Sequence, residues 1–119
     1  MKTVIIQIAL AQGYRQPPLM QDWEAIPTQI PGLYLTRPSI GSREGDQYLY
    51  EPASTGWDLT HKSGWTVGPM TIKSLPKAKA LVAGIGLHGL NWEVSIEEMQ
   101  ANHKVYIQAI REAWEATQL

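Results

Sequence analysis

Residues Gly56–Gly68 read GWDLTHKSGWTVG, and this stretch decides the fold that we predict for the chain. The side chains of Trp57–His61 alternate in polarity, which predicts a strand. Lys62–Gly64 is typical of a tight turn, because glycine readily adopts the positive φ that short hairpin loops need. Trp65–Gly68 then predicts a returning strand. Apolar residues at helical spacing follow, so we expect a helix over about residues 75–88 that packs on this hairpin.

At 119 residues the chain is long enough for one hydrophobic core, so we expect residues 1–119 to form a single domain. It contains no cysteine, which excludes disulfides, thiolate zinc sites and cysteine nucleophiles and is compatible with a reducing compartment. Met1–Ala11 resembles a signal peptide, but its apolar part is too short for one, and no stretch reaches membrane-spanning length. We therefore expect a cytoplasmic protein without a membrane partner.

The net charge of −1 provides no long-range attraction for nucleic acid or for an anionic membrane. The charge is unevenly distributed, because Leu59–Asn91 contains four lysines and no acidic residue, while the segments on either side are net negative. The local positive charge therefore coincides with the predicted hairpin and helix.

The N-terminal half is predicted to consist mainly of strands. In Thr3–Leu10, apolar side chains at every second position predict a strand. Asp22–Ile26 is interpreted as one helical turn that ends at a proline. Two further strands, Leu33–Arg37 and Gln47–Glu51, are predicted to form a hairpin whose loose tip contains the polar loop Gly41–Asp46.

The last helix has the clearest signal in the chain. Ser95 and Glu98 form the capping-box pattern, and the apolar positions that follow trace one face of a helix. Ser74 is expected to cap the N-terminus of the helix predicted over about residues 75–88. We therefore predict an α+β fold: an antiparallel β-sheet of about five strands with a packed helix (about 75–88) and a C-terminal helix (about 95–117).

No catalytic or cofactor-binding pattern is complete in the sequence. Gly84–Gly89 matches the dinucleotide-binding motif G-x-G-x-x-G, but a helical pattern precedes it, so we interpret the glycines as the end of that helix. Asp58 and His61 would point to opposite faces of a strand. The histidines His61, His88 and His103 lack metal-ligand spacing. We therefore expect no enzyme, no metal and no cofactor, unless the three histidines converge in one cleft.

One pattern has a functional interpretation. Aromatic residues that can stack on bases are interleaved with basic residues that can contact phosphates, which is typical of surfaces that bind single-stranded nucleic acid. The aromatic members are Tyr48, Tyr50, Trp57 and Trp65, and the basic members are Arg37, Arg43, Lys62 and Lys73. The residues alone leave open the alternative that these aromatics face the core and the lysines only solvate the surface.

The order Gly-Trp-x-Leu-Thr-His-Lys-Ser-Gly-Trp-x-Val, followed by a helix with Lys77-Ala78-Lys79-Ala80, resembles a known family pattern. It is similar to the superfamily of single-stranded-DNA-binding transcriptional regulators typified by the positive-cofactor-four and Whirly proteins. The whole chain resembles a small group of uncharacterised cyanobacterial proteins assigned to that fold. The diagnostic part covers about Gly56–Trp92.

The resemblance implies a curved antiparallel sheet backed by a helix, which often pairs through that helix into a homodimer, with nucleic acid along the open sheet. By position it singles out Lys62 at the turn, His61 before it, and Trp57 and Trp65 as stacking groups. The chain departs from the family pattern in Asp58 within the hairpin and in its net acidic N-terminal half.

We therefore predict a protein that binds single-stranded DNA or RNA with low sequence preference, and that is not an enzyme. The predicted binding residues are Arg37, Tyr48, Tyr50, Trp57, His61, Lys62, Trp65 and Lys73. The alternative is a protein–protein interaction module with the same fold that does not bind nucleic acid. Its docking element would be the amphipathic helix of residues 95–119.

Overall fold

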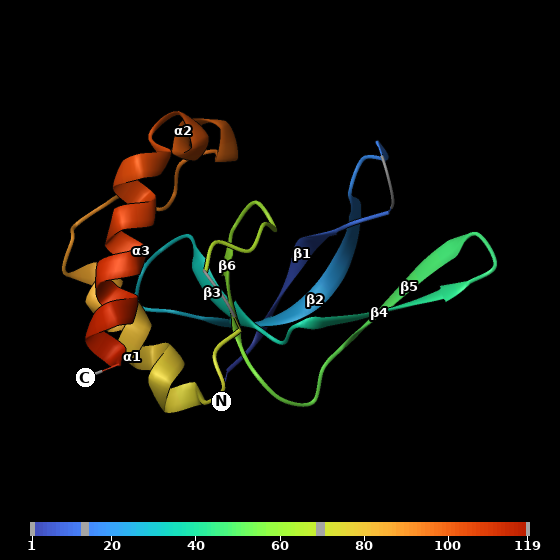
Figure 1. The fold of residues 1–119 in the computed structure, drawn as a ribbon, viewed down its shortest axis with the longest axis horizontal. Helices are drawn as coiled ribbons and strands as arrows, with labels where there is room; N and C mark the ends of the chain where they lie inside the picture. Colours follow the sequence, from blue (N-terminus) through green and yellow to red (C-terminus); the bar gives the residue numbers. More distant parts are fainter. Residues whose placement is uncertain (1, 13–14, 69–70, 119) are drawn as a thin grey trace.

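The computed structural model describes residues 2–12, 15–68 and 71–118. Within these ranges the chain forms six strands and three helices (Figure 1). In order along the chain they are β1 (Val4–Leu10), β2 (Leu19–Pro27), β3 (Leu33–Thr36), β4 (Ser39–Glu44), β5 (Gln47–Pro52), β6 (Asp58–His61), α1 (Leu75–Gly86), α2 (Ile96–Ala101) and α3 (His103–Thr117).

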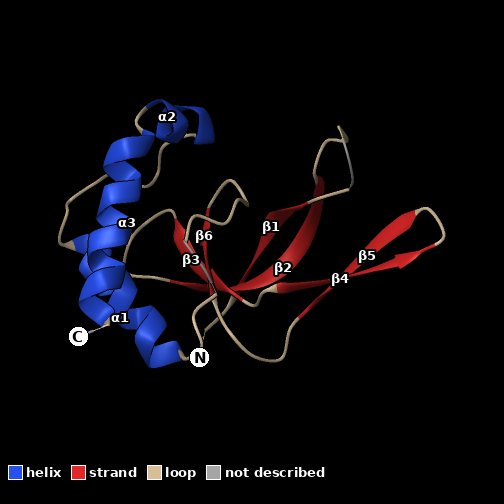
Figure 2. Cartoon of the chain, viewed as in Figure 1, coloured by secondary structure: helices blue, strands red, loops and turns tan. Residues whose placement is uncertain are grey.

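Four of the strands form one antiparallel sheet in the order β1-β2-β3-β6, which confirms the predicted α+β class. The helices α1 and α3 lie side by side at one end of the molecule (Figure 1). The strands β4 and β5 form a separate two-stranded ribbon that projects away from the helices (Figure 2). The strands of the described residues are thus divided between a sheet and a ribbon.

The helical turn predicted for Asp22–Ile26 is wrong, because these residues lie inside β2. This strand pairs on both sides: Ala25 lies opposite Val4 of β1 and opposite Thr36 of β3. The side chains of Trp23 and Ala25, two positions apart, are buried. Pairing with two neighbours and burial of alternate residues therefore outweigh the local helical preference of this segment.

The hairpin predicted for Leu33–Glu51 is also wrong. The strand β3 pairs with β2 and β6, and β5 pairs with β4, which overlaps the segment Gly41–Asp46 interpreted as a loop. Every residue of β4 is exposed, so this strand lacks the alternation of apolar and polar side chains by which a half-buried strand is recognised in a sequence.

The predicted central hairpin forms in part. The strand β6 ends at His61, and Gly64 turns the chain back with a φ of +92°. The returning segment, Trp65–Gly68, follows β6, and the N–H of Val67 donates to the carbonyl of Leu59 (2.8 Å). Its ladder with β6 is a single isolated bridge, so it is not a regular strand.

The turn at the end of β6 also reaches β1. The N–H of Ala9 donates to the carbonyl of Gly64 (3.0 Å), at the edge of β1 that does not pair with β2. The two backbones approach so closely that a Cβ at Gly64 would lie 2.5 Å from the carbonyl oxygen of Gln7. This turn therefore connects the two outer strands of the sheet.

Both predicted helices form, with one interruption. The hydroxyl of Ser74 accepts the N–H of Lys77 (3.3 Å) and caps α1, which ends in the glycine-rich segment as predicted. The hydroxyl of Ser95 accepts the N–H of Glu98 (3.1 Å) and caps α2. The continuous helix predicted to follow is divided into α2 and α3 at Asn102, whose backbone leaves the helical region. None of the helices described is long and apolar enough to cross a membrane.

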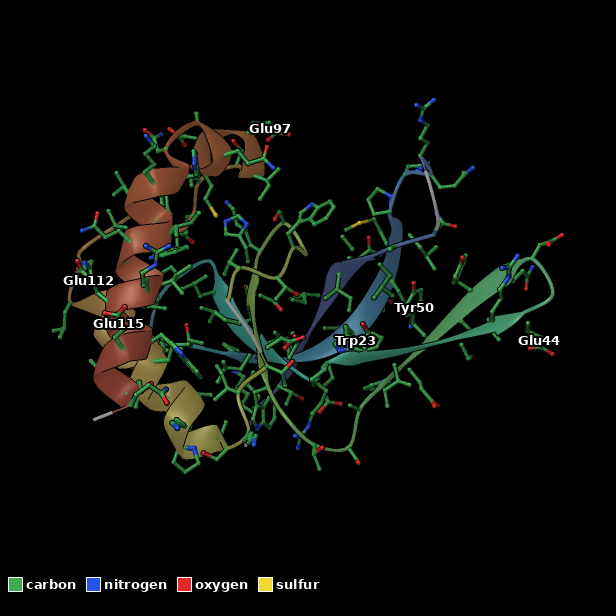
Figure 3. All side chains as sticks on the ribbon, viewed as in Figure 1. Trp23, Glu44, Tyr50, Glu97, Glu112 and Glu115 are labelled. Atoms are coloured by element: carbon green, nitrogen blue, oxygen red, sulfur yellow. The ribbon has the colours of Figure 1, made fainter. Side chains whose placement is uncertain are left out.

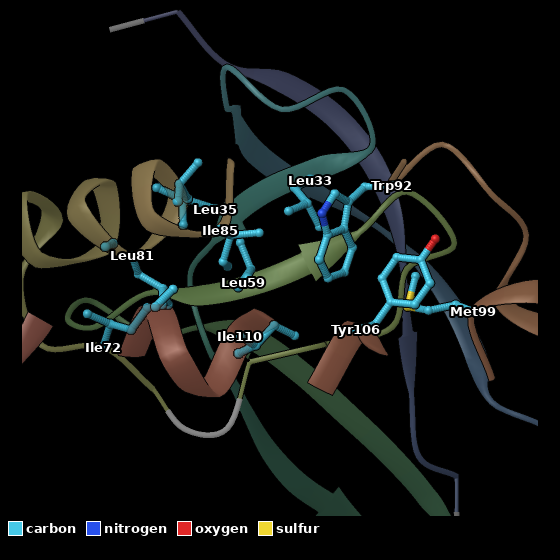
Figure 4. Close-up of a cluster of buried hydrophobic side chains, with 13 residues drawn as sticks. Leu33, Leu35, Leu59, Ile72, Leu81, Ile85, Trp92, Met99, Tyr106 and Ile110 are labelled. Atoms are coloured by element: carbon cyan, nitrogen blue, oxygen red, sulfur yellow. The ribbon is translucent and has the colours of Figure 1, made fainter. Parts of the chain in front are cut away.

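The main core lies between the helices and the strands β3 and β6 (Figure 4). Leu35 and Leu59 are paired across these strands, and Ile26 of β2 pairs with Leu35, so the three side chains share one face. Buried side chains of α1 and α3 cover this face. At the edge of the core, the rings of Trp92 and Tyr106 meet edge to face with their centroids 4.8 Å apart.

A second, smaller cluster lies on β1 and β2, on the face of the sheet that the helices do not cover. It consists of Ile8, Leu10 and Trp23. Side chains alternate between the two faces of a strand, so Trp23, an odd number of positions from Ile26, lies on the other face. Because Ile26 faces the helices, Trp23 points away from them. Tyr50, from the ribbon, packs against this cluster and lies near Trp23 (Figure 3). The cluster therefore anchors the ribbon to the sheet.

Replacing Gly64 by alanine should destabilise the fold more than the same change at Gly45. Both residues have positive φ, but a Cβ at Gly64 would meet the backbone of β1, whereas nothing lies within 4 Å of one at Gly45. We expect Gly45→Ala to lower the free energy of unfolding by about 1 kcal/mol and Gly64→Ala by about 2–4 kcal/mol, measured by urea denaturation. Equal losses would contradict close packing of this turn on β1.

Candidate nucleic-acid interface

The eight predicted binding residues do not form one continuous surface. The structure places them in three groups: Arg37, Trp57 and Lys73 near the start of β6, His61, Lys62 and Trp65 at its end, and Tyr48 and Tyr50 on the ribbon. The first group combines an indole ring, basic side chains and a cavity.

Arg37 and Trp57 form a stacked pair. The guanidinium carbon of Arg37 lies 3.9 Å from the centroid of the Trp57 ring, which is a cation–π contact. Nη1 of Arg37 donates to the carbonyl of Gly56 (3.1 Å), and the carbonyl of Arg37 accepts from Nε1 of Trp23 (3.0 Å). The guanidinium group and the indole are therefore held in position by the fold itself.

A pocket of about 300 Å³ lies beside this pair. Its lining includes Trp23, Trp57 and Arg37, together with Glu24 and Ile26 of β2. The volume is at the lower end of the range found for small-molecule sites. The pocket thus offers aromatic and aliphatic walls, one guanidinium group and one carboxylate.

Lys73 adds a positive charge near the stacked pair. It directly follows Ile72, whose backbone exchanges two hydrogen bonds of 2.7 Å with the backbone of Trp57. The side chain of Lys73 is exposed. Asp58 directly follows Trp57 in the chain, and its carboxylate accepts a hydrogen bond from the hydroxyl of Thr71 (2.8 Å). The acidic residue within the hairpin is therefore engaged by a neighbouring side chain.

The ribbon has two chemically different faces. Arg43 and Tyr48 are paired across the strands, with the guanidinium carbon 5.8 Å from the ring centroid, and Tyr50 shares their face. The other face carries Ile40 and Leu49, which are 50% and 44% exposed. Tyr48 is 37% exposed, so the aromatic and basic face includes one ring that a ligand can reach.

Tyr50 has a structural role. Its hydroxyl donates to the carbonyl of Ala11, and its ring lies over Gly41, where a Cβ would be only 2.9 Å away. The backbone carbonyl of Tyr50 accepts from Nε2 of Gln21 (3.2 Å). These contacts hold the ribbon against the sheet, so Tyr50 positions Tyr48 and is not itself an open stacking surface.

His61 does not lie on the surface, which removes it from the predicted interface: its side chain is fully buried. Nδ1 accepts the backbone N–H of Ser63 (3.1 Å), so we assign the ring proton to Nε2, which donates to the carbonyl of Trp92 (2.9 Å). Burial lowers the pKa of His61, and the hydrogen bond to Trp92 offsets this only in part. His61 is therefore a neutral residue that holds the fold together.

Lys62 and Trp65 remain on the surface, at the opposite end of β6 from Trp57. The ammonium group of Lys62 donates to the carbonyl of Glu93 (2.7 Å), which ties it to the connection between α1 and α2. Trp65 is 46% exposed. The turn thus presents one open indole, but its lysine already has a partner.

The sequence prediction missed Trp23 and Glu24 as pocket residues, because both fall in the segment interpreted as a helical turn. The sequence does contain a signal for this strand, because the acidic residues Asp22 and Glu24 alternate with the apolar residues Trp23 and Ala25. In the structure the two acidic side chains are exposed and the two apolar ones are buried. That alternation indicates a strand with one face on a core.

The three histidines contact different parts of the molecule. His61 is bonded to the Trp92 carbonyl, Nε2 of His88 lies 3.5 Å from a carboxylate oxygen of Glu112, and His103 is exposed at the start of α3. Among the residues that the structure describes, no group of three or more histidine, aspartate or glutamate side chains could hold a metal ion.

No protein-family model, curated protein or solved structure matches this chain. The resemblance of Gly56–Trp92 to single-stranded-DNA-binding regulators therefore stays a prediction, and the function has to be inferred from the geometry of the site.

Acidification should destabilise the protein through His61. Its pKa is lower in the folded state than the usual 6.5, so the unfolded chain binds the proton more readily. The free energy of unfolding should therefore fall as the pH drops below 6.5. Urea denaturation at about pH 7.5 and about pH 5.5 measures this loss. His61→Gln, which cannot take up the proton, should lose less between the two pH values, and an equal loss would contradict the assigned role.

Proposed function

We propose that this protein binds single-stranded DNA or RNA in the cytoplasm, with the Arg37–Trp57 pair as the main contact. The observation that supports the proposal is the stacked guanidinium and indole, 3.9 Å apart, beside a pocket of about 300 Å³. Aromatic rings and guanidinium planes are the surfaces on which unpaired bases stack in proteins of this kind.

Arg37 retains hydrogen-bonding capacity for a ligand. A guanidinium group has five N–H donors, and Arg37 uses Nη1 to bond the Gly56 carbonyl. The remaining donors are suited to phosphate oxygens or to base edges. Stacking on Trp57 fixes the plane of the group, so a ligand would lose little entropy in ordering it.

Tyr48 and Arg43 form a second contact point for the same strand of nucleic acid. The strand β5 runs from this pair toward the pocket, and its last residue, Pro52, is part of the pocket lining. Tyr48 and Pro52 are four positions apart, which corresponds to about 13 Å in a strand. A single strand that contacts both the ribbon and the Arg37–Trp57 pair therefore has to span about this distance.

The charge of the protein limits how much phosphate contacts contribute. The net charge is −1, so attraction must come from the local groups Arg37, Arg43 and Lys73. For about two to three phosphate contacts on a single strand, the logarithm of the binding constant should fall with the logarithm of salt concentration with a slope of about −1.4 to −2.

The alternative function, a protein-interaction module that docks a partner on the terminal helix, has less support. Much of the apolar side of that helix is occupied inside the fold, because Tyr106, Ala109, Ile110 and Ala113 are buried, although Val105 and Ile107 are exposed. Gly84 of α1 lies so close to Ala113 that a Cβ there would be 3.0 Å from the alanine Cβ. The helix α3 thus covers α1. The homodimer that the family resemblance implies stays a prediction, which light scattering of the 13.3 kDa chain would test.

Tyr48→Ala should weaken binding of a fluorescently labelled single-stranded oligonucleotide about tenfold, because stacking contributes about 1–3 kcal/mol per base. The matched control is Leu49→Ala, which truncates a similarly exposed side chain on the other face of the ribbon and should change the affinity less than about twofold. Fluorescence anisotropy at several salt concentrations measures both the affinities and the salt slope. No binding at micromolar protein, or equal effects of the two variants, would contradict the proposal.

A further inference from the structure

We propose that the pocket beside Arg37 and Trp57 takes one guanine base of the bound strand, with Glu24 and Arg37 recognising adjacent edges of that base. The inference rests on the proposed function and adds a base preference to one position of an otherwise nonspecific contact. Its starting point is the unusual combination of a carboxylate and a guanidinium group in one aromatic pocket.

The walls of the pocket suit a flat, uncharged ring system. Trp23 is fixed by its hydrogen bond to the Arg37 carbonyl, and Trp57 is fixed by its backbone bonds to Ile72. Arg37 lies over the ring of Trp57, where a cationic ligand would otherwise stack. A guanidinium group in that place repels cations, so the arrangement differs from an aromatic cage for ammonium ligands.

Glu24 distinguishes this pocket from a phosphate site. It lies on an exposed position of β2, and its carboxylate makes no hydrogen bond or ion pair with any residue that the structure describes. It lines the same pocket as Arg37 without forming an ion pair with it. A carboxylate repels phosphate and accepts hydrogen bonds, so this pocket is suited to a base whose edge carries donors.

Guanine is the base that matches both groups. Its O6 and N7 accept hydrogen bonds from an arginine, which is the commonest base-specific contact in protein–DNA complexes. Its N1–H and N2 amino group are adjacent donors that a single carboxylate can accept together. Thymine and uracil offer one N–H donor, and the donors of adenine and cytosine come from one amino group. The pairing of Arg37 with Glu24 therefore favours guanine.

The preference can be measured with oligonucleotides of thymidine that carry one central dG, dI, dA, dC or dT. Inosine keeps O6, N7 and N1–H of guanine and lacks the N2 amino group. We expect the dG probe to bind about tenfold tighter than the dT probe and several-fold tighter than the dI probe, since one bidentate contact typically distinguishes bases by this order. Anisotropy titrations under one salt condition give these ratios directly.

Two variants assign the preference to the pocket. Glu24→Gln should bring the dG and dI affinities together, because an amide cannot accept both donors of guanine. Glu51→Gln removes an equivalent exposed carboxylate on β5 and should leave the ratio of dG to dI affinities as in the wild type. A melting temperature close to the wild-type value shows that each variant is folded.

The outcomes separate the two proposals. If none of the oligonucleotides binds, the proposed function is wrong, and the base pocket with it. If all of them bind with equal affinity, the protein binds single strands but the guanine pocket is wrong. If Glu51→Gln abolishes the preference as strongly as Glu24→Gln, the preference does not arise in this pocket.

Discussion

The rest of the structure depends on the turn at the end of β6 and on the buried imidazole of His61 that precedes it. Nε2 of His61 donates to the carbonyl of Trp92 in the connection between α1 and α2, which ties the sheet to the helices. The N–H of Lys62 donates to the carbonyl of Gly32 before β3, and the carbonyl of Gly64 accepts from Ala9 of β1. One short segment at the end of β6 therefore bonds to β1 at the other edge of the sheet, to the residue before β3, and to the connection between α1 and α2. A buried polar ring is stable there because both of its nitrogens have partners.

This constraint also positions the candidate site. With the His61 end of β6 held in place, the other end of the short strand brings Trp57 next to Arg37, which follows β3. The chain between β3 and β6 leaves the sheet to form the ribbon and returns at Pro52, beside the same pocket (Figure 1). The pocket is thus lined by residues of β2 and by the segments that leave β3 and lead into β6. Its two indoles are held by the hydrogen bond from Nε1 of Trp23 to the Arg37 carbonyl and by the backbone bonds between Trp57 and Ile72.

The sequence predicts the elements whose signals are local. The alternation of Thr3–Leu10, the serine caps at Ser74 and Ser95, and the positive φ of Gly64 are confirmed, because each depends on residues that are neighbours in the chain. The strand β4 could not be recognised, since all of its side chains are exposed and no pattern of burial marks it. At Asp22–Ile26 a local pattern is misleading. The segment is predicted as a helical turn, but pairing with β1 and β3 makes it part of a strand.

The candidate site could be predicted less well than the fold, because it depends on contacts between distant segments. Arg37 and Trp57 are both recognised from their residue types, but their stacking follows from the pairing of β3 with β6. His61 is placed on the binding surface by the family resemblance, whereas the fold buries it completely. For Glu24 the alternation along β2 indicates only an exposed strand position, and the residue becomes a candidate through its place in the pocket.

The most direct test of the central claim is an NMR titration of the 15N-labelled protein with an unlabelled single-stranded oligonucleotide. The indole N–H groups of the tryptophans give separate signals, which report on different parts of the molecule. Binding at the proposed site should shift the indole N–H of Trp57 and the backbone amides of Arg37, Glu24 and Tyr48, and leave those of α2 and α3 unchanged. Shifts confined to α2 and α3, or no shifts at millimolar oligonucleotide, would contradict it.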